Sequence, residues 1–342
     1  MAKEKYNVAV VGAMGVVGTE MISTLERRNF PIAEFRPLDI PANAGKEVIY
    51  NGKPVKVQAA VKENFKGIDI AIFSAGAAAS KELAPQAVEM GAVVVDNSSQ
   101  WRMDPAIPLV VPEVNPDDLK WHKGIISNPN CSTIQMVVAL KPLHDAGKIK
   151  RVVVSTYQAA SGGGQRGYDG LTTESEEYMK TGKQVAPRVH SVQLAFNAVP
   201  HIDVFEEHGY TKEEYEMVHE TKKILGDKSI QVSPTAVRIP VWYGHSESIN
   251  VETEKKITAD QAREMLSKAP GIVVKDDPAN NVYPTPLETN EKDDVLVGRI
   301  REDLTIPNGL NLWVVANNIR KGAALNSVQI AETLVKMDLV RI

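Results

Sequence analysis

Short apolar runs alternate with helix-like stretches in the first 130 residues. Residues 6–11 (YNVAVV) form a β-branched apolar run that leads directly into glycines, and the VVGTEMISTLERRN that follows has helical apolar spacing. Further apolar runs occur at 68–75 and 92–99, separated by the helix-like KELAPQAVEM. Uninterrupted apolar runs suit parallel strands buried on both faces, so the pattern predicts a doubly wound α/β domain.

From about residue 150 the apolar segments become longer and partly alternating. KRVVVSTYQAAS, AVRIPVWYGHSESINVETEKKI and NLWVVANNI suit a mixed or antiparallel sheet covered on one side, which predicts a second domain of α+β type. Residues 321–337 are helical in period, and we expect them to pack back on the first domain. The predicted domains are therefore residues 1–129 plus 319–342 and residues 130–318.

Length and composition fit two soluble globular domains. The chain has 342 residues, which suggests two domains of about 150 residues each. Hydrophobic residues make up 43% of the chain and charged residues 24%, and no apolar run approaches the ~20 residues that a membrane span needs. We therefore expect a soluble protein that does not act at a membrane.

Charge and cysteine content narrow the class of protein further. With 39 basic and 43 acidic residues the net charge is -4, which provides no basic field for nucleic acid. The N-terminal sequence lacks the small-residue cleavage site of a secretory signal, and the single cysteine cannot form an internal disulfide. These features predict a cytoplasmic protein.

The glycines after the first apolar run have the spacing G-x-x-G-x-x-G, a variant of the dinucleotide-binding fingerprint. They follow a predicted strand and open a predicted helix, where bare backbone lets a pyrophosphate reach the helix N-terminus. Asp39 lies 21 residues after Gly18, where an acidic side chain accepts hydrogen bonds from a ribose. The alternatives are a tight turn without a ligand and a capping aspartate. The predicted cofactor residues of the turn are Gly12, Met14, Gly15, Val16, Val17 and Gly18.

Cys131 follows Ser-Asn-Pro-Asn and precedes a long apolar-periodic stretch, so the sequence places its thiol at a helix N-terminus. The helix dipole and free N–H groups there favour thiolate over thiol and can hold a developing oxyanion. The alternative is a cysteine that serves as a small hydrophobic residue. Its Asn and Ser neighbours favour the nucleophile.

Other candidate groups are weaker. The glycine-rich segment 161–167 is a phosphate cradle or a flexible loop, and the charge run 206–223 resembles a solvated helix face. No histidine pair has metal-ligand spacing, so we expect no metal and interpret six histidines as surface or packing residues. These are His122, His144, His190, His201, His208 and His219.

Five motifs together resemble one family. The glycine turn, SNPNCSTIQ, STYQAASGGG, RIPVWYGHSESINVE and NIRKGAALNSVQIAE occur over nearly the whole chain in the order found in aspartate-β-semialdehyde dehydrogenases. The resemblance implies a dinucleotide-binding (Rossmann-like) first domain and a catalytic and dimerisation domain built on a mixed sheet. It also implies a homodimer or homotetramer assembled through the second domain's sheet.

The resemblance implies roles for individual residues. Cys131 matches the nucleophile, His245 the general acid/base, and Gln158 the residue that orients substrate and thioester. The residues implied to bind substrate are Arg238 at the α-carboxylate, Glu220 at the amino group, and Arg102, Asn130 and Lys223 at the phosphate. The segment 161–167 becomes an active-site loop on the nicotinamide side, and the further implied cofactor residues are Ser161, Gly162 and Asn318.

The implied reaction is reduction of L-aspartyl-4-phosphate to L-aspartate-4-semialdehyde with NADP or NAD, and phosphate as product or co-substrate. It belongs to the biosynthesis of lysine (through diaminopimelate), threonine, methionine and isoleucine. This chemistry needs a thiolate that displaces phosphate and cations that bind the departing phosphate. It also needs a group that transfers a proton and a nicotinamide that donates hydride. Arg238 and His245 are seven positions apart and would face opposite sides of one strand, so we expect Gly244 to interrupt it.

The sequence departs from the family after the second predicted strand. NADP-dependent bacterial members commonly carry A-S-x-R-S-A-G-K there, whereas this chain has Asp-Ile-Pro-Ala-Asn-Ala-Gly-Lys at 39–46. The arginine that binds the 2′-phosphate is replaced by Ala42, and Asp39 suits a free ribose. Asn43, Lys46 or Arg36 remain candidates for reaching a 2′-phosphate. We predict that NAD is used at a rate comparable to that of NADP or better.

Three rival functions remain open. N-acetyl-γ-glutamyl-phosphate reductase runs the same thioester chemistry, but SNPNCST and RIPVWYGH fit it less well, and the sequence around Cys131 differs from that of glyceraldehyde-phosphate dehydrogenases. A non-catalytic dinucleotide-binding paralogue could dispense with Cys131, Arg238 and His245, and all three are present.

Overall fold

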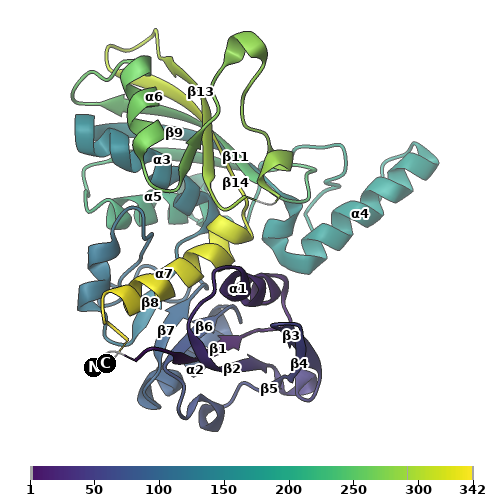
Figure 1. Cartoon of the computed structure of the whole chain (residues 1–342). Coiled ribbons are helices and arrows are strands. Elements are labelled where there is room, and N and C mark those ends of the chain that lie inside the picture. Colours follow the sequence, from purple (N-terminus) through teal and green to yellow (C-terminus); the bar gives the residue numbers. More distant parts are fainter. Residues whose placement is uncertain (1–2, 291, 341–342) are drawn as a thin grey trace. The chain divides into compact units, whose positions relative to one another are not determined.

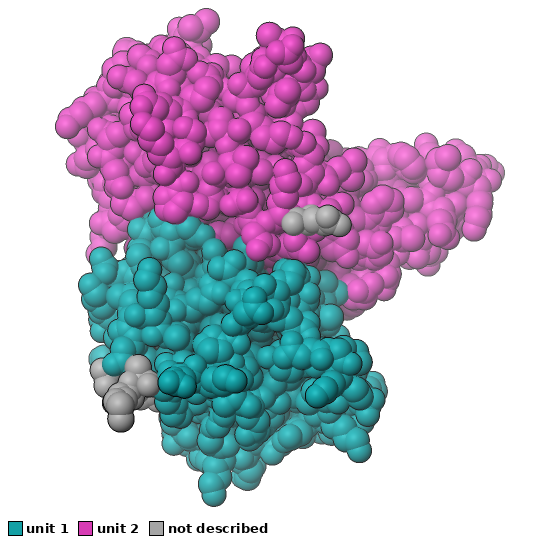
Figure 2. All heavy atoms as spheres, viewed as in Figure 1, with its two compact units in different colours: residues 1–129, 323–342 teal, residues 130–322 magenta. Residues whose placement is uncertain are grey.

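The computed structural model describes residues 3–290 and 292–340. The chain forms two compact units, unit 1 with residues 1–129 and 323–342 and unit 2 with residues 130–322 (Figure 2). None of the helices in the described ranges combines the length and apolar character that a membrane crossing needs.

Unit 1 is built on six parallel strands in the order β5-β2-β1-β6-β7-β8. The chain leaves β1 for β2 on one side and later returns to β6 on the other, so the strand order reverses at β1. This confirms the predicted doubly wound α/β fold. The elements are β1 (Tyr6–Val11), α1 (Val16–Arg27), β2 (Ile32–Asp39), β5 (Gln58–Ala59), β6 (Ile70–Phe73), α2 (Ala77–Glu89), β7 (Val93–Asp96) and β8 (Ile125–Ser127), with a separate hairpin of β3 (Glu47–Tyr50) and β4 (Lys53–Lys56).

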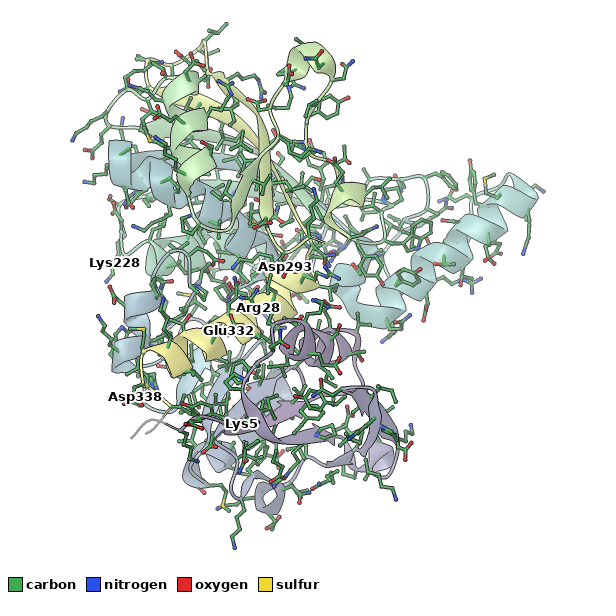
Figure 3. All side chains as sticks on the ribbon, in the orientation of Figure 1. Lys5, Arg28, Lys228, Asp293, Glu332 and Asp338 are labelled. Atoms are coloured by element: carbon green, nitrogen blue, oxygen red, sulfur yellow. The ribbon has the colours of Figure 1, made fainter. Side chains whose placement is uncertain are left out.

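The C-terminal helix α7 (Leu325–Lys336) completes unit 1. Its apolar side chains join the core cluster that contains Val8 and Val10 of β1, while Ala9 and Val11 point into the cluster on the other face of the sheet. Arg28, just after α1, makes a two-pronged ion pair with Glu332 of α7, at 2.7 and 2.8 Å (Figure 3). The final helix therefore packs within unit 1.

Unit 2 is built on a mixed sheet in the order β10-β9-β11-β14-β13-β12 (Figure 1). The outer pairs β10/β9 and β12/β13 are parallel, and the inner pairs are antiparallel. The predicted mixed sheet is therefore confirmed. The elements are α3 (Cys131–Gly147), β9 (Ile149–Gln158), α4 (Gly164–Thr181), α5 (Lys212–Ile224), β10 (Gln231–Arg238), β11 (His245–Thr253), α6 (Ala259–Lys268), β12 (Ile272–Val274), β13 (Val295–Glu302) and β14 (Gly309–Ala316).

The two faces of this sheet differ. Helices α3, α5 and α6 pack against the sheet. Along the strands, buried side chains alternate with side chains that are at least partly exposed, such as Ser248, Asn250 and Trp313. Within unit 2, α4 extends away from the sheet (Figure 1).

The segment 161–167 is helical and is not the loop that the sequence suggested. It forms a short 3-10 helix at 160–163 and the first turn of α4. Gly164 has φ +70°, and a Cβ on Gly167 would lie 2.1 Å from the Ala160 carbonyl oxygen. The glycines therefore allow a sharp turn and close packing between two helical segments rather than a flexible loop.

Candidate active site and cofactor cavity

The glycine turn of unit 1 is shaped by close backbone approach. Gly12 has φ +82°, and a Cβ there would lie 2.4 Å from the Ser74 carbonyl oxygen. A Cβ on Gly18 would lie 2.0 Å from the Gly12 carbonyl oxygen. Gly15 is the N-cap of α1, which has no side-chain cap and no acidic residue in its first turn. The first N–H groups of α1 are thus kept free of side chains, as binding of a pyrophosphate requires.

A cavity of about 500 Å³ lies beside this turn. It is lined at the carboxyl ends of β1, β2 and β6 by Gly12, Asp39 and Ser74, among others. In open α/β sheets this is where ligands bind, outside the point at which the strand order reverses. Val16, Val17 and Gly18 lie in the first turn of α1 beside it, and Met14 and Gly15 belong to the lining.

The charge around the cavity is mainly acidic. Asp39, 7% exposed, accepts hydrogen bonds from Met14 N–H at 2.9 Å and from the Asn43 amide at 2.8 Å. Of the described residues that line the cavity, Asp39 and Glu82 are acidic and none is basic. Arg36 forms an ion pair with Glu34 and donates hydrogen bonds to two backbone carbonyls. Lys46 donates to the side chain of Asn43 at 2.7 Å.

Arg102, implied to bind phosphate, belongs to unit 1. It is buried, and its guanidinium donates to the carbonyl oxygens of Asn128 at 3.1 Å and Asn97 at 3.3 Å. These contacts fix its side chain at the end of β7 and β8, just before the chain enters unit 2.

In unit 2 the predicted polar residues meet at one edge of the sheet. Gln158 and Arg238 are the last residues of the parallel strands β9 and β10 and are register partners. His245 begins β11, whose next residue, Ser246, pairs with Tyr157. Gly244, with φ +87°, lies between β10 and β11, so the expected interruption between Arg238 and His245 is confirmed. The break lets both residues reach the same edge despite their odd separation.

Cys131 is the first residue of α3, as its sequence context predicted. Asn130 caps this helix, because its side-chain oxygen accepts the Ser132 N–H at 2.9 Å. A Cβ on Gly322 would lie 2.8 Å from Cys131 Cβ, so the glycine of the NIRKGAA motif lies directly against the cysteine. The thiol is partly exposed and stands at the positive end of the helix dipole.

The interpretation of the charge run 206–223 as a solvated helix face, which excepted only Glu220 and Lys223, is wrong for Glu213 and Glu214 of α5. Glu213, Glu214 and Glu220 are 8%, 8% and 0% exposed. Glu214 forms a capping box with Thr211 and accepts the Ala236 N–H. Donors from neighbouring elements thus offset the cost of burying these carboxylates, which local sequence does not show.

Glu213 connects two predicted site residues and was missed by sequence reasoning. One carboxyl oxygen accepts from the Gln158 amide at 2.9 Å, and the other accepts from the Asn130 amide at 2.9 Å. Burial raises the pKa of Glu213, and the nearby Glu216 raises it further. The available signal was spacing, since Glu213, Glu216 and Glu220 stand at helical positions i, i+3 and i+7 on one face.

Glu220 and Lys223 lie farther along α5. Glu220, implied to meet the substrate's amino group, is fully buried and accepts the Asn130 N–H at 2.8 Å. Lys223, implied to bind phosphate, is half-buried in the last turn of the helix. The backbone N–H of Asn130 therefore donates to Glu220, and its side-chain amide donates to Glu213 and, at 3.0 Å, to Glu216.

Arg238 and His245 are both buried. Burial lowers the pKa of the His245 imidazole well below its ordinary value, and the charge of Arg238 lowers it further. Arg238 donates to the Ala159 carbonyl at 2.7 Å, while its Nε is buried without a hydrogen-bond partner. His190, expected to be a surface or packing histidine, also lies within electrostatic reach of Arg238, and its Nε2 is buried without a partner.

The residues implied to lie on the nicotinamide side also come together in unit 2. The Asn318 amide donates to the Ser161 hydroxyl at 3.0 Å, and its carbonyl oxygen accepts the Gly244 N–H at 2.9 Å. A Cβ on Gly162 would lie 2.5 Å from Arg238 Nη1 and 3.4 Å from His245 Cε1. A side chain at this position would require the Arg238 guanidinium to shift, whereas His245 lies at an ordinary contact distance. Within residues 3–290 and 292–340, no group of three acidic, His or Cys side chains is arranged to hold a metal.

Two family models match the chain. Residues 7–122 match "Semialdehyde dehydrogenase, NAD binding domain", and residues 140–321 match "Semialdehyde dehydrogenase, dimerisation domain". The first match lies in unit 1 and the second in unit 2.

Individual relatives are similar along the whole chain. The aspartate-semialdehyde dehydrogenase of Aquifex aeolicus is 56% identical over 338 residues, covering 98% of this chain and 99% of the relative. Aspartate semialdehyde dehydrogenase II of Vibrio cholerae, solved in complex with ASA, has a TM-score of 0.94 at 48% identity and covers 98% of this chain and 99% of that chain. The enzyme of Candida albicans, solved with NADP, has a TM-score of 0.77 at 26% identity and covers 98% and 99% of the two chains. The resemblance drawn from the five motifs is confirmed.

Proposed function

The chain belongs to the aspartate-semialdehyde dehydrogenase family, and on this premise we propose that it reduces L-aspartyl-4-phosphate to L-aspartate-4-semialdehyde. The observation that carries the proposal is the meeting of Gln158, Arg238 and His245 at one sheet edge, joined through Glu213 to the cap of the Cys131 helix. The reaction serves the synthesis of amino acids derived from aspartate, among them lysine, threonine, methionine and isoleucine.

Cys131 acts as the nucleophile. Its thiolate attacks the acyl carbon and displaces phosphate, so that a thioester forms. Because α3 begins at Cys131, the helix dipole stabilises the anionic sulfur. Gln158 orients the acyl group. The unit 1 cavity would hold the dinucleotide, and Ser161, Gly162 and Asn318 are the cofactor residues that we propose in unit 2. The cofactor would supply hydride for reduction of the thioester.

The charged residues select the substrate. Arg238 has a buried Nε donor without a partner, and a substrate α-carboxylate would satisfy it while it pairs with the guanidinium. Glu220 supplies negative charge for the amino group, and Arg102 and Lys223 supply positive charge for the phosphate. Asn130 holds the cap of the nucleophile's helix, and we propose that it also contributes to the phosphate site, as the resemblance implies.

The test is a spectrophotometric assay of the full chain with aspartate semialdehyde and phosphate, run in parallel with NAD and NADP. Phosphate-dependent reduction of the nicotinamide is the expected result. The same preparation tested with the longer N-acetylglutamate semialdehyde is the control for substrate length. Turnover of the longer substrate alone would contradict the proposal.

We infer that NAD is used at a rate comparable to that of NADP or better. Asp39 and Glu82 line the cavity. Ala42 stands where NADP-dependent members have an arginine, and Arg36 is paired with Glu34. A carboxylate beside a phosphate dianion is repulsive, whereas it accepts readily from a ribose hydroxyl. A kcat/KM for NADP more than about a hundredfold above that for NAD would contradict this; a charge-assisted arginine contact is worth about that factor or less. Asp39→Ala combined with Ala42→Arg should move the ratio toward NADP.

We also infer assembly into a homodimer or homotetramer through unit 2. The match to a dimerisation domain and the exposed apolar side chains Met179, Phe196 and Phe205 in this unit support it. Sedimentation of the purified chain measures the state directly. A single free cysteine fits the reducing cytoplasm, where we place the protein.

A further inference from the structure

Three asparagines of unit 1 are joined by side-chain hydrogen bonds into an amide chain. The Asn326 amide donates to Asn128 Oδ1 at 2.7 Å, and the Asn128 amide donates to Asn97 Oδ1 at 2.6 Å. Asn128 and Asn326 are 0% exposed, and Asn97 is partly exposed. Asn97 and Asn128 directly follow β7 and β8, whereas Asn326 lies in the first turn of α7, which packs against β7 (Figure 1). The amide chain therefore connects the last helix to the ends of two strands.

A backbone carbonyl fixes the direction of the amide chain. Asn326 Nδ2 also donates to the Val110 carbonyl oxygen at 3.1 Å, and a carbonyl can only accept. Asn326 therefore turns its nitrogen toward Asn128, which presents its oxygen in return and points its own nitrogen at Asn97. Neither Asn128 nor Asn326 can exchange its amide oxygen and nitrogen without facing donor to donor or acceptor to acceptor.

The backbone carbonyls of two of these asparagines hold the guanidinium of Arg102. Arg102, 9% exposed, donates from Nε to the Asn128 carbonyl oxygen at 3.1 Å and from Nη2 to the Asn97 carbonyl oxygen at 3.3 Å. The Asn97 and Asn128 side chains are bonded to each other, and the Asn128 N–H donates to the Asp96 carbonyl at 2.7 Å. These bonds set the separation of the two carbonyls and, through them, the position of the guanidinium.

An amide at position 326 is not what packing of α7 requires. Apolar residues of this helix, among them Val328 and Leu334, belong to the core of unit 1, and an apolar side chain would suit that environment. A buried amide is unfavourable unless hydrogen bonds offset its desolvation, but once satisfied it fixes the orientation of its partners. Asn326 therefore suits positioning better than packing.

We propose that Asn326 is a positioning residue for the phosphate site, which acts on Arg102 through Asn128 and Asn97 and does not itself touch the substrate. This inference deepens the proposed function and rests on it, because there Arg102 supplies positive charge for the phosphate. The roles implied by the family resemblance do not include Asn326.

Asn326→Ala breaks the amide chain at its buried end. In assays of the full chain with aspartate semialdehyde, phosphate and the nicotinamide, we expect the KM for phosphate to rise about tenfold. Complete loss of a charge-assisted arginine contact would raise it by about 10- to 100-fold, and a displaced guanidinium loses only part of that contact. The KM values for aspartate semialdehyde and for the nicotinamide should change less than about twofold. An unchanged phosphate KM, or equal rises in all three, overturns the proposal.

Val328→Ala is the matched control, because Val328 is a buried core residue of the same helix and lies outside the amide chain. We expect it to lower the thermal midpoint, as a cavity in a core does, and to leave the phosphate KM unchanged. A rise like that of Asn326→Ala would show that any weakening of α7 disturbs phosphate binding, and it would overturn a specific role for Asn326.

A double-mutant cycle with Arg102 separates positioning from a general structural effect. Arg102→Lys should itself raise the phosphate KM, and Asn326→Ala added to it should raise that KM less than about twofold further, because both changes act through the guanidinium. Independent effects that multiply overturn the proposal. If Asn326→Ala fails to fold, Asn97→Ala breaks the amide chain at its other end and takes its place in the cycle.

Binding of inorganic phosphate, measured by calorimetry, makes the same comparison without turnover. We expect Asn326→Ala to weaken it by the same factor of about ten, and a parent chain that binds no phosphate, or a variant that binds it as tightly as the parent, overturns the proposal. Failure of the parent to turn over aspartate semialdehyde contradicts the proposed function instead. The two failures are therefore distinguishable.

Discussion

The N-termini of α1 and α3 carry the same partial positive charge and are used in opposite ways. The first turn of α1 is bare, because its cap is Gly15 and Gly12 and Gly18 pack backbone against backbone. The first turn of α3 is filled, because Asn130 caps it and Glu220 accepts the Asn130 N–H. A bare end can receive a mobile pyrophosphate, whereas a filled end can hold a reactive thiolate in place.

The difference shows that helix termini are specified by their neighbours as much as by the helix. Unit 1 achieves an open end by removing side chains. Unit 2 surrounds its end with the buried carboxylates of α5, which keep the amide of Asn130 oriented. The first arrangement is encoded locally, and the second depends on a segment about 80 residues away in the chain.

The largest effect should follow from removing the group that the filled end holds. Cys131→Ser should lower turnover by about 10⁴-fold or more, because a hydroxyl is scarcely ionised there and an ester is much less reactive than a thioester. Dinucleotide binding, measured by fluorescence titration, should persist. Activity within threefold of the parent would reject Cys131 as the nucleophile.

The bare end should be sensitive to a single methyl group. Gly18→Ala would place a Cβ 2.0 Å from the Gly12 carbonyl, so we expect the KM for the dinucleotide to rise at least about a hundredfold or unit 1 to lose stability. Gly15→Ala is the matched control for the stability of unit 1, since its Cβ would meet only an ordinary contact at 3.4 Å. Thermal unfolding and cofactor KM of both variants make the comparison. Equal effects of the two would show that the close approach is not what the turn requires.

Substitution of Arg238 should act mainly on substrate binding and therefore on the substrate KM. Arg238→Lys replaces a two-pronged contact by a point charge, and we expect the KM for aspartate semialdehyde to rise about 10- to 100-fold. Arg299→Lys, on the exposed part of the same sheet, is the control and should leave KM unchanged. A fall in kcat with constant KM would assign Arg238 to the chemical step instead.

The smallest effect concerns Glu247, which follows His245 by two residues on β11 and faces the same side. It is fully buried, and neither of its carboxyl oxygens makes a hydrogen bond of ordinary geometry. The Gln135 amide lies nearby and donates to the His245 carbonyl at 3.3 Å. Burial raises the pKa of Glu247 well above 4.5, Glu213 raises it further, and Gln135 offsets part of the rise. The folded chain therefore retains a proton that the unfolded chain loses as the pH rises through about 4.5.

Glu247→Gln removes this titration. Its stability relative to the parent should grow with pH by up to about 1.4 kcal/mol per unit above pH 4.5, for as long as the folded Glu247 stays protonated. Thermal midpoints of both chains at several pH values measure the difference. A constant difference across this range would show that Glu247 titrates alike in the folded and unfolded chains.

Most of the fold could be predicted because its signals are local. The apolar run and glycine turn of β1 and α1, and the Asn-Cys start of α3, each lie within about ten residues, and the structure confirms them. The break at Gly244 followed from counting positions along a strand. The five motifs, distributed over the chain, identified the family.

What the sequence could not show depends on contacts between distant segments. Glu213 looks like a surface residue until Gln158 and Asn130 supply its donors, and the orientation of His245 depends on the hydrogen bond from the Ala159 N–H. The segment 161–167 looks like a loop because glycine weakens a helix, yet close packing of Gly167 on Ala160 requires it. In each of these cases a contact with another segment of the fold determines how the residue is placed.

The return of α7 to unit 1 affects how the protein is made. Val328 and Leu334 cover one face of a sheet whose strands all lie before residue 130. At about 5–20 residues per second, translation of residues 130–322 takes roughly 10 to 40 s, and during this time that apolar face has no cover. The growing chain therefore presents a surface for chaperones or for aggregation until its last helix emerges. The unit that is synthesised first is the one that is completed last.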